Sequence, residues 1–390
     1  MGKHIYVHNP FCAGKCPYCD FYSVAEPSLI EDYYDCAARE VKLWAKQLEN
    51  SEMFSDDCEG AGCSVYFGGG TPSYPDATYI VNLMKTIVRE FKIPEDSENT
   101  IEINPSSITG EKAGMYRDAG FNRASVGIQS LDDGILKTLG RRHDSAAAAA
   151  AVAILQDAGF RNISADLIIG VPGQTTDGII RDIELFEHMG IKHISTYSLT
   201  IEEGTPFYKK YRHLEDVMPP ETEREMYHKS RDFLAATGFV PYEISNSALP
   251  GYQSRHNSSC WRGEEYAAIG AGAHGYLDSV RFGHKDDVKD YINVLQDIAA
   301  SDRIPEGLIY REEVMSIGDK MREYPFLRLR TTEGIDRVEF ERRFGMALDE
   351  VFPKAIKDNV SRGLLEDCGR YVRLSSSGLD FASLVMEDFL

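Results

Sequence analysis

The sequence lacks any run of about 18 consecutive apolar residues, so it predicts no membrane-spanning helix. It also lacks the basic start, apolar stretch and small-residue cleavage site of a signal peptide, because Met1–His4 leads directly into the strand-like segment Ile5–Val7. We therefore expect a cytoplasmic protein, whose eight cysteines are thiols or metal ligands rather than disulfides.

Basic residues are scarce as well. The chain has 42 Lys and Arg against 62 Asp and Glu, which gives a net charge of −20. Binding a phosphate backbone needs a dense basic surface, so we do not expect nucleic acid as a partner. A local basic groove stays open.

Short apolar, β-branched segments alternate with longer helix-like stretches over the first half of the chain. Strands are expected at Ile5–His8, Ser64–Phe67, Thr100–Asn104, Arg123–Ile128, Asn162–Ile169 and His193–Leu199. Helices are expected between them, at Leu29–Leu48, Tyr79–Phe91, Glu111–Ala119, Ala146–Ala158 and Thr176–Met189. This alternation predicts an α/β fold with a parallel sheet. Six such units fit an open, partial (β/α)6 barrel of the TIM type, although the pattern alone does not exclude a doubly wound sheet.

We expect three parts: a barrel over residues 1–220, an extension over 221–305 and a C-terminal domain over 306–390. The segment Ser301–Gly307 is the expected linker. The last part predicts a small winged-helix-like α+β domain. Its helices are expected near Arg311–Arg322, Arg337–Phe344 and Leu348–Asn359, and its strands at Leu364–Glu366 and Tyr371–Leu374.

Three cysteines follow the first expected strand with the spacing CxxxCxxC: Cys12, Cys16 and Cys19. Thiolates are soft ligands that suit iron–sulfur clusters, zinc or copper(I). A closed structural zinc site wants four ligands, and this loop offers three. Three thiolates on a four-iron cube would leave one iron open. A zinc loop with a distant fourth ligand is the alternative.

The motif YxHxPFCxxxCxxCDF, together with most of the chain after it, resembles the radical S-adenosylmethionine (SAM) superfamily in its coproporphyrinogen III dehydrogenase-like branch. The resemblance implies a 4Fe–4S cluster on Cys12, Cys16 and Cys19, with the open iron chelating SAM. An electron from the reduced cluster then cleaves SAM into methionine and a 5′-deoxyadenosyl radical.

The resemblance also implies where SAM binds. The Gly-rich segment Gly68–Pro72 looks like the loop that holds the methionine amino group, and Glu102 suits the amine or the ribose hydroxyls. Arg141 is a fork-shaped donor suited to the SAM carboxylate. No catalytic residue is assigned. The expected SAM-binding set is Tyr6, Tyr18, Gly69, Gly70, Thr71, Glu102, Gln129, Arg141 and Asp166.

Two functions compete within this branch. One is an oxygen-independent coproporphyrinogen III dehydrogenase, which decarboxylates porphyrinogen propionates, and the other is a heme chaperone. The chaperone is favoured because only five residues precede Tyr6, whereas the dehydrogenase resembles a longer chain with an N-terminal extension. Phe21 also stands where the dehydrogenase has a fourth cysteine. In addition, His256–Trp261 resembles the chaperone's HNxxYW heme-binding motif.

The candidate heme site is therefore His256, Cys260 and Trp261. A neutral His256 imidazole could ligate heme iron, and Trp261 could pack against the macrocycle. Cys260 replaces the tyrosine of the motif. Its thiolate could itself ligate heme, or the change could mean that heme is not the cargo.

These expectations imply partners. They are heme-accepting proteins, with respiratory and membrane-associated ones as candidates, and an electron donor such as flavodoxin or ferredoxin. A homodimer stays open. Two rival functions are a radical SAM tRNA-modifying enzyme, for which the sequence shows no basic RNA-binding appendage, and a non-catalytic iron–sulfur or zinc scaffold.

Overall fold

Residues 3–49, 62–296 and 303–390 are described in the computed structural model of the chain. All six predicted strands form, and they lie side by side in chain order as a parallel sheet. Parallel neighbours place all their carboxyl ends at one edge of the sheet, which fixes where the loops after the strands meet. The strands are β1 (His4–Asn9), β2 (Ser64–Gly69), β3 (Glu98–Ile103), β4 (Arg123–Gln129), β5 (Asn162–Ile169) and β6 (His193–Ser198).

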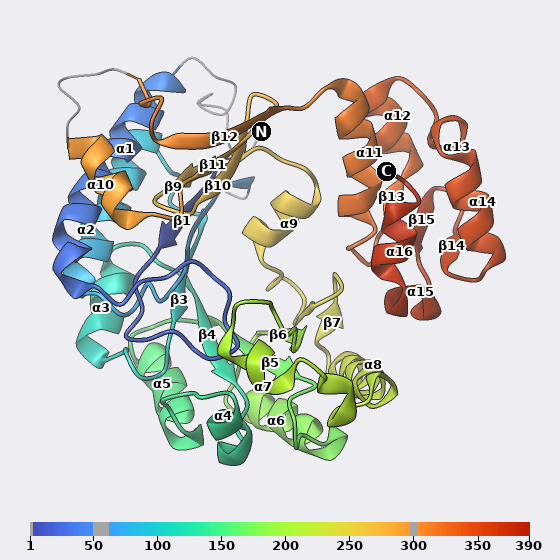
Figure 1. Cartoon of the computed structure of the whole chain (residues 1–390), viewed down its shortest axis with the longest axis horizontal. Helices are drawn as coiled ribbons and strands as arrows, with labels where there is room; N and C mark the ends of the chain where they lie inside the picture. Colours follow the sequence, from blue (N-terminus) through green and yellow to red (C-terminus); the bar gives the residue numbers. More distant parts are fainter. Residues whose placement is uncertain (1–2, 50–61, 297–302) are drawn as a thin grey trace.

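Helices between these strands cover the outside of the curved sheet (Figure 1). Their apolar faces pack on the strands, and one continuous core of buried side chains joins the two layers. The predicted α/β fold with an open, partial barrel is confirmed. The helices are α1 (Ile30–Gln47), α2 (Ala77–Phe91), α3 (Gly110–Asp118), α4 (Asp133–Thr138), α5 (Ser145–Asp157) and α6 (Thr176–His188).

Shorter strands extend both edges of the barrel sheet. On one edge β9 (Ala267–Ile269) pairs in parallel with β1, and on the other β8 (Asn246–Ala248) runs antiparallel to β6 and carries β7 (Val240–Pro241). Because β7 and β9 end the sheet without pairing to each other, the barrel is open within the described residues. Helices α7 (Pro206–Tyr211), α8 (Pro220–Ala236) and α9 (Arg255–Trp261) belong to this part of the chain.

A second sheet is formed by β10 (His274–Leu277), β11 (Val280–His284) and β12 (Ile309–Val314). Helix α10 (Val288–Gln296) lies between β11 and β12 in the chain. The expected helix at Arg311–Arg322 is wrong in its first third, because that segment pairs with β11 as a strand. The helix begins only at Ile317. The start of the expected linker Ser301–Gly307 lies outside the described residues.

The C-terminal domain has its own buried core, separate from that of the barrel. Its small antiparallel sheet has the order β13 (Ile335–Asp336), β15 (Tyr371–Leu374), β14 (Leu365–Asp367). The predicted small C-terminal α+β domain is confirmed. Its helices are α11 (Ile317–Arg328), α12 (Arg337–Phe344), α13 (Leu348–Val351), α14 (Pro353–Ser361), α15 (Ser376–Asp380) and α16 (Ala382–Glu387).

A fully buried carboxylate fastens the second sheet and α10 to the barrel. Glu40 on α1 accepts hydrogen bonds from Trp44 Nε1 (3.0 Å), Gly270 N (2.9 Å), His284 Nε2 (2.7 Å) and Tyr291 Oη (2.6 Å). Four donors compensate for the cost of burying this charge.

None of the helices in the described ranges combines the length and the apolar character needed to cross a bilayer.

Candidate functional site

The three-cysteine loop follows β1 at the carboxyl edge of the sheet. Cys12, Cys16 and Cys19 are all partly exposed. The loop is closed by backbone hydrogen bonds from Cys12 N to Val24 O (3.1 Å) and from Val24 N to Pro10 O (2.7 Å). Burial raises the pKa of the Cys19 thiol, and the neighbouring Cys16 and Cys12 add to the shift.

No group of three or more His, Cys, Asp and Glu side chains in the described part of the chain is arranged to hold one metal ion. A mononuclear zinc site needs its ligands to converge in that way. A 4Fe–4S cube instead takes its thiolates on different irons.

The Gly-rich segment after β2 lies directly against the cysteine loop. Gly70 N donates to Asn9 O (2.7 Å) and Thr71 N to Phe11 O (2.9 Å), while Cys12 Sγ and Thr71 Oγ1 are 3.2 Å apart. A Cβ on Gly70 would lie 2.9 Å from both carbonyl oxygens and 3.2 Å from the Cys12 sulfur, so a side chain has no room there. These contacts place Gly70 and Thr71 beside Cys12.

Two carboxylates from the middle of the sheet are partly buried inside the barrel. Glu102 on β3 accepts a hydrogen bond from Tyr66 Oη (2.8 Å), and Asp166 on β5 accepts one from Ser125 Oγ (3.5 Å). Burial raises the pKa of Glu102 to about 7 and that of Asp166 to about 6. These acceptors suit an ammonium group or ribose hydroxyls.

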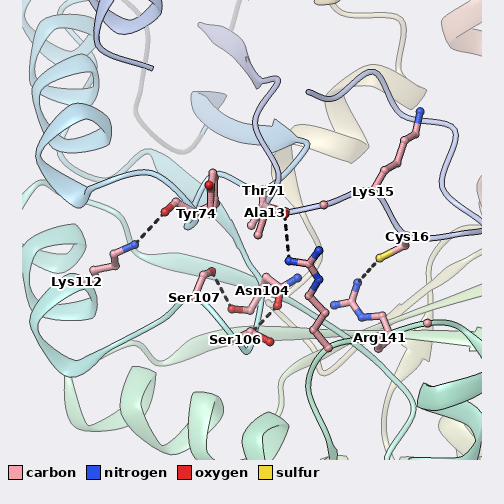
Figure 2. A pocket seen from close by; sticks show the side chains of 13 residues that line it. Ala13, Lys15, Cys16, Thr71, Tyr74, Asn104, Ser106, Ser107, Lys112 and Arg141 are labelled. Atoms are coloured by element: carbon pink, nitrogen blue, oxygen red, sulfur yellow. Dashed lines mark hydrogen bonds between the residues drawn. The ribbon is translucent and has the colours of Figure 1, made fainter. Parts of the chain in front are cut away.

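Arg141 follows α4 and points back toward the cysteine loop (Figure 2). It donates to Gly127 O (2.6 Å) and lies 3.6 Å from Cys16 Sγ and 3.5 Å from Tyr18 Oη. Its Nε is buried without a partner among the described residues. Gln129, at the end of β4, has a left-handed backbone (φ 75°), and its amide nitrogen lies beside Gly127, as does the Arg141 guanidinium.

The remaining predicted neighbours sit around these groups. Tyr6 lies deeper in the barrel, where its hydroxyl is 3.0 Å from His8 Nδ1 and its ring is stacked with that of Tyr66. Burial and the nearby Glu102 raise the pKa of Tyr6. Tyr18 is partly buried against Phe207 of α7.

A cavity of about 310 Å³ opens beside the cysteine loop (Figure 2). Its lining carries four cations and no carboxylate, so it favours an anionic group. Sequence reasoning found Arg141 but missed Lys15, Lys112 and Arg142. Lys15 lies inside the CxxxCxxC motif and Arg142 adjoins Arg141, whereas nothing in the sequence singles out Lys112. The lining residues are Ala13, Gly14, Lys15, Cys16, Thr71, Tyr74, Asn104, Ser106, Ser107, Lys112, Gly140, Arg141 and Arg142.

The predicted heme residues lie elsewhere, on α9. His256 is 5% exposed, stacks on Tyr66 and hydrogen-bonds through Nδ1 to Ser64 Oγ (2.9 Å). Ser64 begins β2, so His256 lies at the amino end of the strands, opposite the cysteine loop. Burial and the nearby His4 and Arg123 lower the pKa of His256 to about 3, which keeps its ring neutral.

The amino end of α9 is held by Glu98 of β3. The Glu98 carboxylate accepts hydrogen bonds from Arg255 N (2.9 Å) and His256 N (3.2 Å). Cys260, one turn after His256, is partly buried, and burial raises the pKa of its thiol to about 11. Trp261 points to Arg330 at the C-terminal domain, whose guanidinium carbon lies 4.5 Å from the centroid of the indole ring.

Comparison with known families agrees with this arrangement. Residues 6–186 match the radical SAM superfamily, and residues 318–381 match the HemN C-terminal domain. The fold and the cysteine loop together define a radical SAM protein with a HemN-type C-terminal domain.

Relatives that match the whole chain show to which family within the superfamily it belongs. The chain is 33% identical over 391 residues to heme chaperone HemW of Bacillus subtilis, and the match covers 100% of this chain and 99% of that protein. It is 32% identical over 386 residues to heme chaperone HemW of Lactococcus lactis, with 99% and 96% coverage. The chain belongs to the HemW family.

A solved structure shares the fold. Coproporphyrinogen III oxidase (HemN) from Escherichia coli superposes with a TM-score of 0.80 over 100% of this chain and 89% of that chain. Only 18% of the residues are identical, so the likeness shows the fold alone.

Proposed function

We propose that this chain is a cytoplasmic radical SAM heme chaperone, which binds a 4Fe–4S cluster, SAM and heme and passes heme to acceptor proteins. The observation that carries this proposal is the end-to-end match to relatives named heme chaperone HemW. The alternative, coproporphyrinogen III decarboxylation, rests on a likeness in fold alone.

The residues around the cysteine loop fit a cluster and SAM. Cys12, Cys16 and Cys19 would hold the cluster, and when bound the cluster would supply the electron that cleaves SAM. Arg141 has a buried Nε with no hydrogen-bond partner among the described residues. Its guanidinium and the carboxylates of Glu102 and Asp166 offer opposite charges for the two ends of an amino acid. Gly69, Gly70, Thr71 and Gln129 would complete the pocket, with Tyr6 and Tyr18 as neighbours.

Heme would bind at α9, through His256, Cys260 and Trp261. His256 is neutral, as an iron ligand must be, but its ring is covered. Ligation by His256 therefore requires α9 to move away from Glu98. Cys260 is a weaker candidate, because its raised pKa keeps the sulfur protonated at neutral pH.

The partners follow from this role. Heme-accepting proteins would receive the cargo, and a flavodoxin or ferredoxin would reduce the cluster. Lys15 and Arg142 are exposed beside the cysteine loop. This cationic surface would attract an electron donor whose docking surface is acidic.

One pair of assays separates the two functions. The anaerobically reconstituted protein is first titrated with heme, and is then incubated with coproporphyrinogen III, SAM and a reductant. The chaperone proposal predicts saturable heme binding and no decarboxylation. Decarboxylation without heme binding would establish the dehydrogenase instead.

A further inference from the structure

A second cavity, of about 240 Å³, lies where the C-terminal domain meets the barrel. Its walls come from α8, the segments after β7 and after α11, strands β14 and β15, and α15. Three arginines and several hydroxyl groups face it. The lining residues are Arg231, Glu243, Ile244, Leu329, Arg330, Thr331, Thr332, Glu366, Arg373, Leu374, Ser375, Ser376 and Leu379.

Two of the three arginines are already engaged within the protein. Arg231 Nη1 donates to the carbonyl oxygens of Glu243 (3.0 Å) and Ile244 (3.3 Å). Arg373 Nε donates to Glu366 Oε2 (3.0 Å). Arg330 is the arginine in the cavity wall whose guanidinium makes no hydrogen bond or ion pair with the described residues.

Arg330 lies against the heme-motif tryptophan. Its guanidinium stacks on Trp261, and its Nε is buried with no hydrogen-bond partner in the described ranges. The indole Nε1 of Trp261 is also buried and unpartnered there. Buried donors are normally satisfied, so these two nitrogens leave donors available to an acceptor supplied by a ligand.

The acidic neighbour Glu243 does not fill that role. Its carboxylate is hydrogen-bonded by Ser245 N (3.1 Å) and by the amide of Asn246. Burial raises the pKa of Glu243, although Arg330 and Arg231 act in the opposite direction.

Arg330 is also held in place by its backbone. Arg330 O accepts from Ile244 N (3.0 Å), and Thr332 N donates to Tyr242 O (3.1 Å). His256 and Trp261 are five residues apart on α9 and so project from different faces of a helix with 3.6 residues per turn. Trp261 therefore faces Arg330, whereas His256 faces the strands of the barrel.

We propose that Arg330 binds a carboxylate arm of the protein's ligand in this cavity, beside Trp261. Under the proposed heme function, on which this inference rests, the arm is a heme propionate. The fork of the guanidinium matches a carboxylate. The cavity is smaller than the roughly 300–1,000 Å³ of pockets for drug-sized ligands, so it takes the arm and not the macrocycle.

The test compares heme with heme dimethyl ester, in which both carboxylates are blocked. Each is titrated into the full-length, anaerobically reconstituted wild type and into Arg330→Gln, Arg330→Lys and Arg342→Gln. Arg342 is the matched control, since it is an exposed arginine on α12 that lies outside the cavity wall. Thermal unfolding and cluster absorbance report whether each variant is folded.

We expect Arg330→Gln to weaken heme binding by about tenfold to a hundredfold, the range for a hydrogen bond to a charged group. Arg330→Lys should lose less affinity than Arg330→Gln, and Arg342→Gln should match the wild type. The ester should bind the wild type more weakly than heme does and lose nothing further in Arg330→Gln.

Equal losses for heme and ester, or an unchanged heme affinity in Arg330→Gln, would overturn the carboxylate site and leave the chaperone proposal standing. If Arg330→Gln does not fold, the wild type decides the question: equal affinity for heme and for its ester would overturn the carboxylate site. A wild type that binds neither compound would overturn both the carboxylate site and the chaperone proposal.

Discussion

Cys12 and Thr71 are 59 positions apart in the sequence, yet Cys12 Sγ lies 3.2 Å from Thr71 Oγ1. The contact joins the cysteine loop after β1 to the Gly-rich segment after β2. Parallel pairing of β1 with β2 brings the two segments to the same edge, with Asn9 opposite Gly69. The groups assigned to the cluster and to SAM thus become neighbours through the sheet register.

Removing any one cysteine of the loop is predicted to abolish the cluster. Cys12→Ser, Cys16→Ser and Cys19→Ser should each lose most of the iron and sulfide, because hydroxyls are poor ligands for an iron–sulfur cube. Iron analysis of the anaerobically reconstituted proteins checks this. Cys368→Ser, at an exposed position, is the control and should keep its iron. Full iron content in Cys16→Ser would contradict the assignment.

SAM binding is predicted to depend on the ionisation of Glu102. The raised pKa of about 7 means that the carboxyl is mostly protonated at pH 6 and mostly ionised at pH 8. SAM should therefore bind up to about tenfold more tightly as the pH rises through this range, if the ionised form binds the amine or ribose. Calorimetry at several pH values measures it.

The Glu102→Gln variant should bind SAM weakly and lose that pH dependence. Glu111→Gln, an exposed acid on α3, should behave as the wild type. If the pH profile of SAM binding persists unchanged in Glu102→Gln, the pH dependence belongs to another group.

Glu40 is predicted to be a major source of stability. Glu40→Gln should lower the free energy of unfolding by about 3–5 kcal/mol, because it removes one member of a buried ion pair. Burial disfavours charged His284, but the Glu40 carboxylate outweighs that effect and raises the pKa of His284 above 6.5.

The stabilisation from this pair should be complete below pH 6.5 and should fall as the pH rises through the folded-state pKa of His284. Urea unfolding at several pH values measures it, with the exposed Glu350→Gln as the control. A Glu40→Gln deficit that grows with pH would contradict the sign.

Loosening α9 is predicted to help heme reach His256. Glu98→Gln weakens two hydrogen bonds to the amino end of α9, so heme ligation by His256 should become faster. Stopped-flow absorbance measures the rate. Glu95→Gln, an exposed neighbour, should leave it unchanged, and His256→Ala in the Glu98→Gln background should remove the gain. An equal gain without His256 would show that His256 is not the iron ligand.

The fold could be predicted from the sequence where local pattern and tertiary structure agree. Strands such as Asn162–Ile169 are short, rich in apolar residues and mostly buried, so the sequence pattern alone predicted them. The helix predicted at Arg311–Arg322 was wrong in its first part. Its charged residues favour a helix locally, whereas pairing with β11 makes that part a strand.

The site could be predicted only in part. The cysteine spacing and the position after β1 placed the loop, and the family resemblance supplied Glu102, Arg141 and Asp166. The burial of His256 at the opposite end of the barrel depends on the long-range contact of α9 with Ser64, which no local pattern encodes. The same is true of the stack between Trp261 and Arg330.

The most direct test of the account is electron paramagnetic resonance of the reduced, anaerobically reconstituted protein with and without SAM. A cluster with three cysteine ligands predicts a 4Fe–4S signal that changes when SAM binds the open iron. The triple Cys→Ser variant should give no such signal, with or without SAM. A protein that carries zinc instead of iron, or a signal that does not respond to SAM, would contradict it.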